Sequence, residues 1–187
     1  MQLPIGVFDS GVGGLTVLRA LRAALPGERF LYLGDTARLP YGTKSGETVT
    51  RYAEQAARVL VGRGIKLLVV ACNTASAVAL GHLAAVFAPL PVLGVIEPGA
   101  EAACAASVTG EIAVIATEGT VRGGAYERAI RARRPTAAVI SRPCQLFVAL
   151  AEEGWVRGAI AEAVARRYLE ALVAEYPGVD GLVPGCP

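Results

Sequence analysis

Cys72 and Cys186 stand in similar local sequences. In LLVVACN and GLVPGC an apolar run leads into a small residue and then a cysteine, and the two cysteines lie 114 residues apart. Two thiols on opposite sides of an amino acid can remove the Cα proton from one face and return a proton to the other. Each thiol can be tuned by its own neighbours, because the thiolate is the reactive form. The pair therefore predicts a racemase.

The sequence around Cys72 gives the stronger of the two indications. The run before it predicts a strand, and Asn73 or Thr74 is expected to cap the helix that follows. Free amides and the dipole at a helix start stabilise a thiolate, so we expect the pKa of Cys72 to lie below the usual value of about 8.5. The alternative is an inert buried cysteine, the usual role of a lone cysteine. The two hydrogen-bonding side chains beside it favour a site.

Residues 9–14, Asp-Ser-Gly-Val-Gly-Gly, follow another predicted strand. The glycines let the backbone approach a ligand closely, and amides at the next helix start could hold a carboxylate. Taken alone, however, Asp9 or Ser10 is better interpreted as a helix cap. The spacing is not the dinucleotide fingerprint, and Asp35, the nearest acidic residue after a second strand, lacks a convincing ribose-binding context. A nucleotide-binding domain is thus a weak alternative.

The remaining cysteines and the single histidine give no indication of a metal. The cysteines at 72, 104, 144 and 186 show no CxxC spacing and no pairing with histidine, so no metal site is expected. Cys104 falls in an Ala-rich helical segment and is interpreted as a core residue, and Cys144 as structural. No cofactor is expected either, because neither lysine, Lys44 nor Lys66, stands in a convincing pyridoxal site.

The composition excludes several classes of protein. With 187 residues, 53% of them hydrophobic and 18% charged, the chain can bury a core as one large domain or two small ones. A net charge of +2 without a dense basic cluster argues against a nucleic-acid partner. The uncharged stretch 73–96 contains His82 and two prolines, and it predicts a helix followed by a strand, not a membrane span. The N-terminal sequence is not a signal peptide, so a cytoplasmic protein without structural disulfides is expected.

Apolar runs alternate with helical patterns along the whole chain, which predicts an α/β fold with mainly parallel sheets flanked by helices. Ligands in such folds bind beyond the carboxyl ends of the strands. A break near residues 96–98 divides the chain into two similar lobes, 1–97 and 98–187. The predicted strands are 5–9, 30–34, 67–72, 92–96, 112–117, 138–141 and 181–185. The predicted helices are 15–25, 47–61, 75–87, 98–106, 121–133 and 156–176.

Five motifs together resemble the glutamate racemases. IGVFDSGVGGLTVL, LGDTARLPYGTKS, VVACNTASA, TEGTVRGGAY and LAEEGW occur in the order and at the spacing usual for that family. The resemblance extends from Ile5 to Cys186 and is highly specific as a set. It implies two α/β lobes with the active site in the cleft between them. It also implies cofactor-independent interconversion of L- and D-glutamate, the D-isomer supplying peptidoglycan synthesis.

The resemblance also implies roles for individual residues. Cys72 and Cys186 would be the two acid/base thiols, with Asp9 supporting Cys72 and Glu152 supporting Cys186. The substrate-binding residues that the motifs imply are Asp9, Ser10, Tyr41, Gly42, Asn73, Thr74, Thr117 and Thr120.

The sequence departs from the family pattern after Cys186. The family continues there with Thr-His and a segment that completes the first lobe, whereas Pro187 is the last residue here. We therefore expect the first lobe to be incomplete, with an exposed sheet edge. Slow or absent racemisation by this chain alone is expected to follow.

Two alternatives stay open besides a glutamate racemase. One is a related two-cysteine racemase for aspartate or another amino acid, against which the PYG and CNTAS motifs argue. The other is a catalytically impaired form that binds glutamate in the same cleft without turnover. The expected partner in each case is a small molecule. A homodimer and an allosteric activator are matters that the sequence leaves open.

Overall fold

The computed structural model describes residues 3–186, which fall into two compact units. The first ends at Val95, and the second comprises Ile96–Cys186. The predicted break after residue 97 therefore falls inside the first turn of helix α4 (Ile96–Ala106), two residues beyond the division. Each unit has a sheet of its own, so each can be described by itself.

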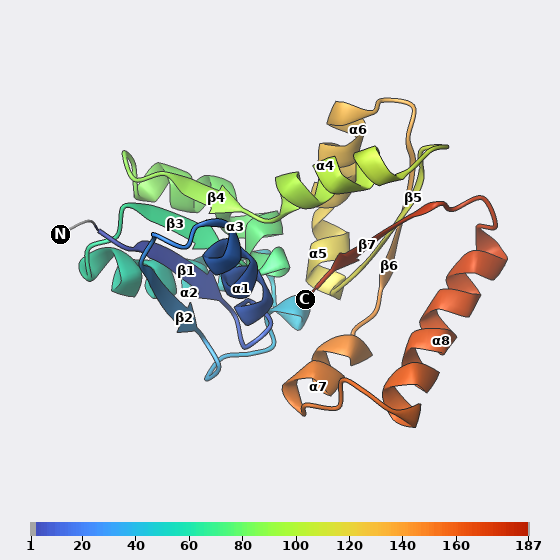
Figure 1. Ribbon diagram of the computed structural model, residues 1–187, viewed down its shortest axis with the longest axis horizontal. Helices are drawn as coiled ribbons and strands as arrows, with labels where there is room; N and C mark the ends of the chain where they lie inside the picture. Colours follow the sequence, from blue (N-terminus) through green and yellow to red (C-terminus); the bar gives the residue numbers. More distant parts are fainter. Residues whose placement is uncertain (1–2, 187) are drawn as a thin grey trace. The chain divides into compact units, whose positions relative to one another are not determined.

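The first unit contains a four-stranded parallel sheet in the order β2-β1-β3-β4. In-register pairing sets Asp9 beside Gly34 and Phe8 beside Val70, so the strand ends meet at one edge (Figure 1). All pairings are parallel, as the continuous apolar runs predicted. The strands are β1 (Ile5–Asp9), β2 (Phe30–Gly34), β3 (Leu67–Val70) and β4 (Val92–Gly94).

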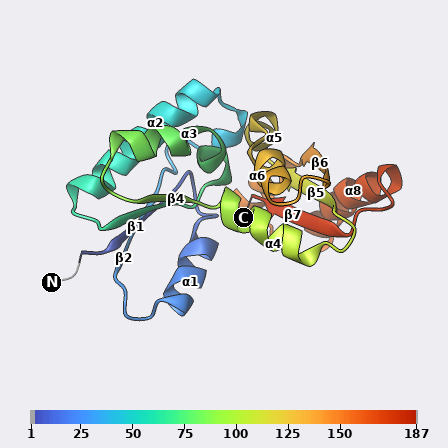
Figure 2. The same cartoon turned by 90° about the horizontal axis from the view of Figure 1, so that it is seen from above.

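Helices cover both faces of this sheet. Because side chains alternate along a strand, Phe8 and Val70 point into the core formed with α2 (Gly46–Gly62) and α3 (Asn73–Val86). Val7 and Val69 point to the other face, where α1 (Leu15–Ala24) packs (Figure 2). The sheet is thus buried between helical layers at the strand ends that carry Asp9 and Cys72.

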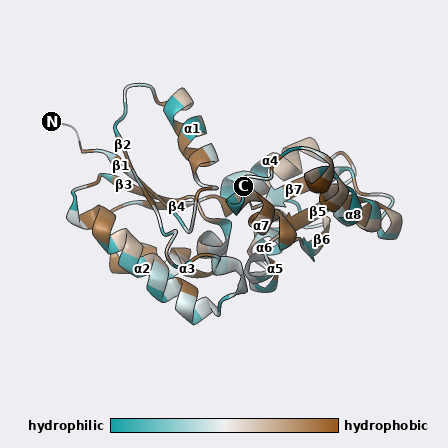
Figure 3. Cartoon of the chain, turned by 90° about the horizontal axis from the view of Figure 1, so that it is seen from below, coloured by the Kyte–Doolittle hydropathy of each residue, from teal (hydrophilic) through white to brown (hydrophobic). Residues whose placement is uncertain are grey.

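The second unit contains a three-stranded parallel sheet in the order β6-β5-β7. Its centre is β5, in which every residue after the first is buried. Figure 3 shows the hydropathy of the residues along the chain. The ring centroids of Phe147 on α7 and Tyr168 on α8 lie 5.2 Å apart and join these two helices. The elements are β5 (Glu111–Ala116), α5 (Glu118–Gly123), α6 (Ala125–Arg133), β6 (Ala138–Pro143), α7 (Leu146–Glu152), α8 (Ala159–Glu175) and β7 (Gly181–Gly185).

Some predicted elements need correction. The single helix expected over 121–133 is two helices, because Gly124 adopts a left-handed φ of 59° between α5 and α6. Helix α7 and the 3₁₀ turn η1 (Tyr41–Thr43) were not predicted, because both are too short to show a period. The predicted α/β class with parallel sheets is confirmed.

The uncharged stretch 73–96 is a helix followed by a strand, as predicted, since it contains α3 and β4. Among the residues that the structure describes, no helix combines the length and the apolar character that crossing a membrane requires.

Candidate active site

Cys72 is the N-cap of α3, two residues beyond the end of β3. Its Sγ accepts a hydrogen bond from the Ala75 N–H at 3.4 Å and donates one to Ser10 Oγ at 3.3 Å. The expectation that Asn73 or Thr74 caps this helix was therefore wrong, because the sulfur itself takes that position. The thiol is 5% exposed and held between two loops.

Burial raises the pKa of the Cys72 thiol, and the nearby charge of Asp9 raises it further. The hydrogen bonds with Ser10 and the Ala75 amide lower the pKa, but by less. The expected depression of the pKa by the helix start is therefore wrong, because the cost of desolvating a thiolate exceeds the gain from the amides.

Asp9 ends β1 and is buried, with 4% of its surface exposed. Its Oδ2 accepts a hydrogen bond from the Gly11 N–H at 2.8 Å. Burial raises the pKa of Asp9, although amides of Gly11, Gly14 and Ser10 counteract the rise. The N-cap of α1 is Gly14, without a side-chain cap, so neither Asp9 nor Ser10 is the simple helix cap that the residues alone favoured. The carboxylate instead organises the loop beside Cys72.

The turn η1 contributes Tyr41 and Gly42, both buried. The Tyr41 hydroxyl donates to Asp35 Oδ2 at 2.5 Å, so its side chain is already engaged. Burial and this bond raise the pKa of Tyr41. What the turn can offer a ligand is its backbone, because the first amides of a helical turn have no partner within it.

Asn73 and Thr74 lie in the first turn of α3, beside the thiol, and both are buried. The structure therefore brings Cys72, Asp9, Ser10 and the first residues of α3 together at one edge of the first sheet. This is the arrangement that the strand-end rule predicted.

Cys186 in the second unit follows β7 directly and is partly exposed. Its location matches that of Cys72, because β7 pairs with the central strand β5 as β3 pairs with β1. Tyr126 on α6 packs against Gly185, the residue before the cysteine. Burial raises the pKa of Tyr126 to about 12, and the charge of Cys186 contributes to the rise. Sequence reasoning missed Tyr126, although it ends the TEGTVRGGAY motif.

The remaining predicted site residues lie in the second unit. Thr117 caps α5 through its Oγ1, which accepts from the Thr120 N–H at 3.3 Å, and the two hydroxyls lie 3.0 Å apart. Both threonines are buried at the end of β5, in the same unit as Cys186. Glu152 is the last residue of α7, and its side chain is exposed to solvent.

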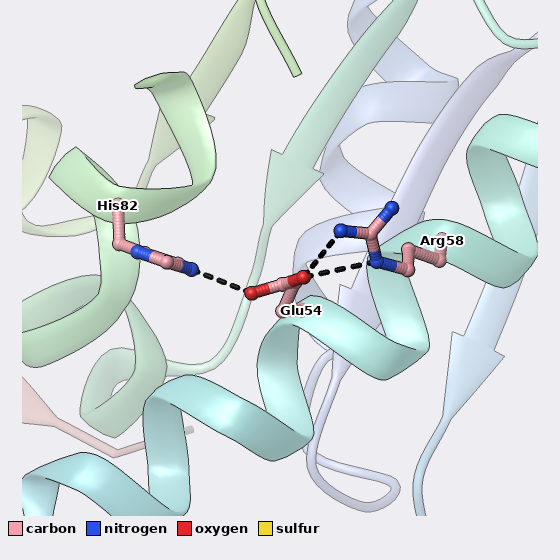
Figure 4. Close-up of polar contacts among 3 residues, drawn as sticks. All are labelled: Glu54, Arg58 and His82. Carbon is pink, nitrogen blue, oxygen red and sulfur yellow. Dashed lines mark hydrogen bonds and ion pairs between the residues drawn. The ribbon is translucent and has the colours of Figure 1, made fainter. Parts of the chain in front are cut away.

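His82 lies away from the thiol on the outer side of α3. It is 43% exposed, and its Nε2 lies 2.6 Å from Glu54 Oε2, while Glu54 also pairs with Arg58 (Figure 4). The ten residues between Cys72 and His82 correspond to about 15 Å along a helix axis. That histidine takes no part in the chemistry stays a prediction.

The site in the first unit thus holds a thiol that donates to a hydroxyl, together with a carboxylate whose charge acts on the thiol, and the second unit holds a thiol at the matching strand end. Such groups exchange protons with carbon acids, which acid/base residues can do without further help when the geometry is right.

Comparison with known proteins agrees with this chemistry. A family model described as "Asp/Glu/Hydantoin racemase" matches residues 5–187. The chain belongs to this racemase family.

Individual members of the family are similar over nearly the whole chain. The glutamate racemase of Geobacter metallireducens is 57% identical over 182 residues, which are 97% of this chain and 66% of that protein. That of Aquifex aeolicus is 50% identical over 98% of this chain and 70% of its own length. The chain therefore spans about two thirds of the relatives that it matches.

Solved structures of family members give the same result. A Francisella tularensis glutamate racemase in complex with D-glutamate superposes with a TM-score of 0.90 at 40% identity, covering 99% of this chain and 68% of that one. The glutamate racemase isoform RacE1 from Bacillus anthracis superposes with a TM-score of 0.93 at 38% identity, covering 98% of this chain and 68% of that one. An aspartate racemase from Picrophilus torridus, 16% identical with a TM-score of 0.64, shares the fold.

Proposed function

We propose that this protein is a glutamate racemase that interconverts L- and D-glutamate by two-thiol proton transfer without a cofactor. The observation that carries the proposal is the placement of Cys72, buried between Ser10 and the start of α3 and next to Asp9. Cys186 at the matching strand end of the second unit supplies the partner acid that racemisation needs. Relatives named glutamate racemase at 45–57% identity support the choice of glutamate.

In the proposed reaction one cysteine, as thiolate, takes the Cα proton of one enantiomer. The other cysteine, as thiol, gives its proton to the opposite face of the same carbon, and the two roles exchange with the other enantiomer. The proton lost from the substrate is retained on the first sulfur, so protons balance in each direction. The reaction requires both sulfurs to face one bound substrate.

In this proposal Asp9 couples substrate binding to the protonation of Cys72. The Asp9 charge raises the pKa of Cys72. The ammonium group of glutamate, placed beside Asp9, would compensate that charge and lower the pKa of the thiol. Asp9 thus acts both on the substrate and on the base.

In this proposal the other predicted site residues bind the substrate or support Cys186. Ser10, Asn73 and Thr74 surround Cys72 and would bind the ammonium and carboxylate groups, together with the backbone of Tyr41 and Gly42. Thr117 and Thr120 would contact the substrate from the second unit, and Glu152 would support Cys186. A cytoplasmic role in supplying D-glutamate for peptidoglycan belongs to the same proposal.

Two alternatives are less well supported. A racemase for aspartate is less well supported, because the likeness to the Picrophilus torridus aspartate racemase is at 16% identity and shows the fold alone. A protein that binds glutamate without turnover uses the same residues and differs only in its chemistry, so an exchange experiment decides between them.

The test is incorporation of solvent deuterium at Cα of L- and D-glutamate without added pyridoxal phosphate, followed by mass spectrometry. Exchange with both enantiomers, even at a slow rate, would support the proposal. Cys72→Ser and Cys186→Ser should each lower racemisation by about 10²-fold or more, because each removes an acid/base group. Full activity in either variant would contradict the two-thiol assignment. Binding of glutamate without any exchange would favour the non-catalytic alternative.

A further inference from the structure

Asp35 is a buried carboxylate that the proposed chemistry does not use. It follows β2 directly, is 8% exposed, and its backbone N–H donates to the Asp9 carbonyl at 2.9 Å. This bond fixes Asp35 to the end of β1, where Asp9 stands beside Cys72. Burying a carboxylate is costly unless its oxygens are paired, so its partners indicate what it does.

Both partners of Asp35 bind the same oxygen. Arg38 Nε lies 2.7 Å from Oδ2, and the Tyr41 hydroxyl donates to Oδ2 at 2.5 Å. The pKa of Arg38 is raised chiefly by its bond to Asp35. The guanidinium is held in turn, since it lies over the Tyr52 ring at 4.4 Å and donates to Gln55 on α2. The carboxylate is therefore clamped between an arginine and a tyrosine.

Through its hydrogen bond to Asp35, the Tyr41 side chain restrains the backbone of the turn η1. Its ring is 1% exposed and packs against Phe8 and Tyr52, with centroids 6.2 and 5.9 Å away. Those contacts pack the ring, and the hydroxyl bond to Asp35 fixes its far end. The side chain is thus anchored at both ends, and the turn η1 that begins at Tyr41 is anchored with it.

We propose that Asp35 is a positioning residue for substrate binding. Held by Arg38, it fixes the Tyr41 side chain and thereby the turn whose Tyr41 and Gly42 backbone receives a carboxylate of glutamate. The inference rests on the proposed function and deepens it. A carboxylate that served packing alone could be replaced by an apolar side chain at lower cost, and it would have no reason to lie at the ligand-binding edge of the sheet.

The experiment compares Asp35→Asn, Tyr41→Phe and the double variant with wild type, using steady-state racemisation kinetics of L-glutamate. Each single change should raise KM about tenfold, the effect of losing one hydrogen bond to a charged group, and should leave kcat within about threefold. Because the two residues act through one bond, the double variant should be no worse than the worse single variant. Glu28→Gln is the matched control, since Glu28 precedes β2 as Asp35 follows it and pairs with Lys66 at 2.5 Å.

The outcomes separate this inference from the proposed function. An unchanged KM in Asp35→Asn, with a melting temperature lowered as in Glu28→Gln, would overturn the inference and leave a structural role. Additive effects in the double variant would overturn it too. If wild type exchanges no deuterium, the proposed function fails; calorimetric titration with L-glutamate then decides the inference, through a weaker Kd in Asp35→Asn and Tyr41→Phe. If Asp35→Asn does not fold, Tyr41→Phe alone provides the test.

Discussion

The two cysteines are unequal in their surroundings. Cys72 is buried, hydrogen-bonded on two sides and next to a carboxylate, whereas Cys186 is partly exposed and has the hydroxyls of Thr117 and Thr120 in its unit. Asp9 ends the central strand of the first sheet, and Thr117 follows the central strand of the second. Counted along the paired strands, Ser10 corresponds to Thr117 and Asp9 to Ala116, so the first unit carries a charge where the second has an alanine. In the proposed reaction, the ammonium group of the substrate compensates that charge.

Replacing Asp9 tests this dependence. Asp9→Asn removes the charge that raises the pKa of Cys72, so the pKa of the thiol should fall and thiolate should form at lower pH. The measurement is the ultraviolet absorbance of the thiolate during a pH titration, with Cys72→Ser subtracted as the background. An unchanged or higher titration midpoint would show that the Asp9 charge does not act on the sulfur.

For single residues, the sequence predicted which residues form the candidate site better than it predicted their pKa values. The local pattern was enough to place Cys72 at a strand end, because strand, cysteine and helix start are neighbours in the chain. Its pKa was predicted in the wrong direction, because the dominant causes are burial and Asp9. Asp9 is 63 positions away, and no local pattern shows how deep a side chain will lie. The role of Asp35 was missed for the same reason, since its partners become visible only after folding.

At the scale of elements, the loop before α1 depends on Gly14, which lies very close to the Asp9 side chain. A Cβ on Gly14 would lie 2.5 Å from the Asp9 Cβ, so that one of the two would have to shift, and 3.1 Å from the Ala71 Cβ, which is a tight contact. The glycine at this position is therefore required by the carboxylate that it packs against. It is one of the residues that determine where Asp9 lies.

Gly14→Ala should therefore displace Asp9 and destabilise the protein by about 1–3 kcal/mol, as overpacking does. Racemisation should fall with it. Gly81→Ala is the control, because Gly81 is exposed on α3 and a Cβ there meets nothing within 4 Å. Removing a helical glycine should raise stability by up to about 1 kcal/mol. Thermal melts of both variants provide the check, and equal effects would show that the space around Gly14 is not limiting.

The element boundaries show which signals a sequence carries. The seven strands were predicted within two residues at each end, because buried parallel strands are continuous apolar runs. The division of 121–133 into two helices was not predicted, since a glycine in a helical pattern is compatible with either outcome and only the left-handed φ of Gly124 decides it. Helix α7 has only seven residues, six of them apolar, so it is too short to show a helical period.

At the scale of the whole molecule, hydrogen bonds from charged side chains connect the loops to the sheet in the second unit. In the second unit Asp180, just before β7, accepts hydrogen bonds from the Ser107 hydroxyl and from the amides of Val108 and Thr109 at 2.8 and 2.7 Å. Arg134 donates to the Ser107 and Val108 carbonyls of the same loop. One ionised carboxylate and one guanidinium together hold the loop that leads into β5.

The hydrogen bonds of Asp180 predict how the stability of the second unit changes as the pH falls. The Ser107 and Thr109 bonds lower the pKa of Asp180 to about 2 from an ordinary 3.8. A carboxyl with a depressed folded-state pKa stabilises the fold above its unfolded-state pKa and loses that contribution as the pH falls. Stability should therefore decline from about pH 4 down to about pH 2.

Asp180→Asn should lack this part of the decline and should be less stable than wild type at neutral pH. The fluorescence of Trp155, the single tryptophan of the chain, reports on the second unit in thermal melts at several pH values. Parallel acid profiles of the two proteins would mean that Asp180 contributes no pH-dependent stability.

The raised pKa of the Cys72 thiol also has a consequence for chemical damage. Peroxides and electrophiles attack the thiolate, so a buried thiol with a raised pKa is a poor target. We therefore expect peroxide to oxidise Cys72 more slowly than a thiol that is exposed to solvent.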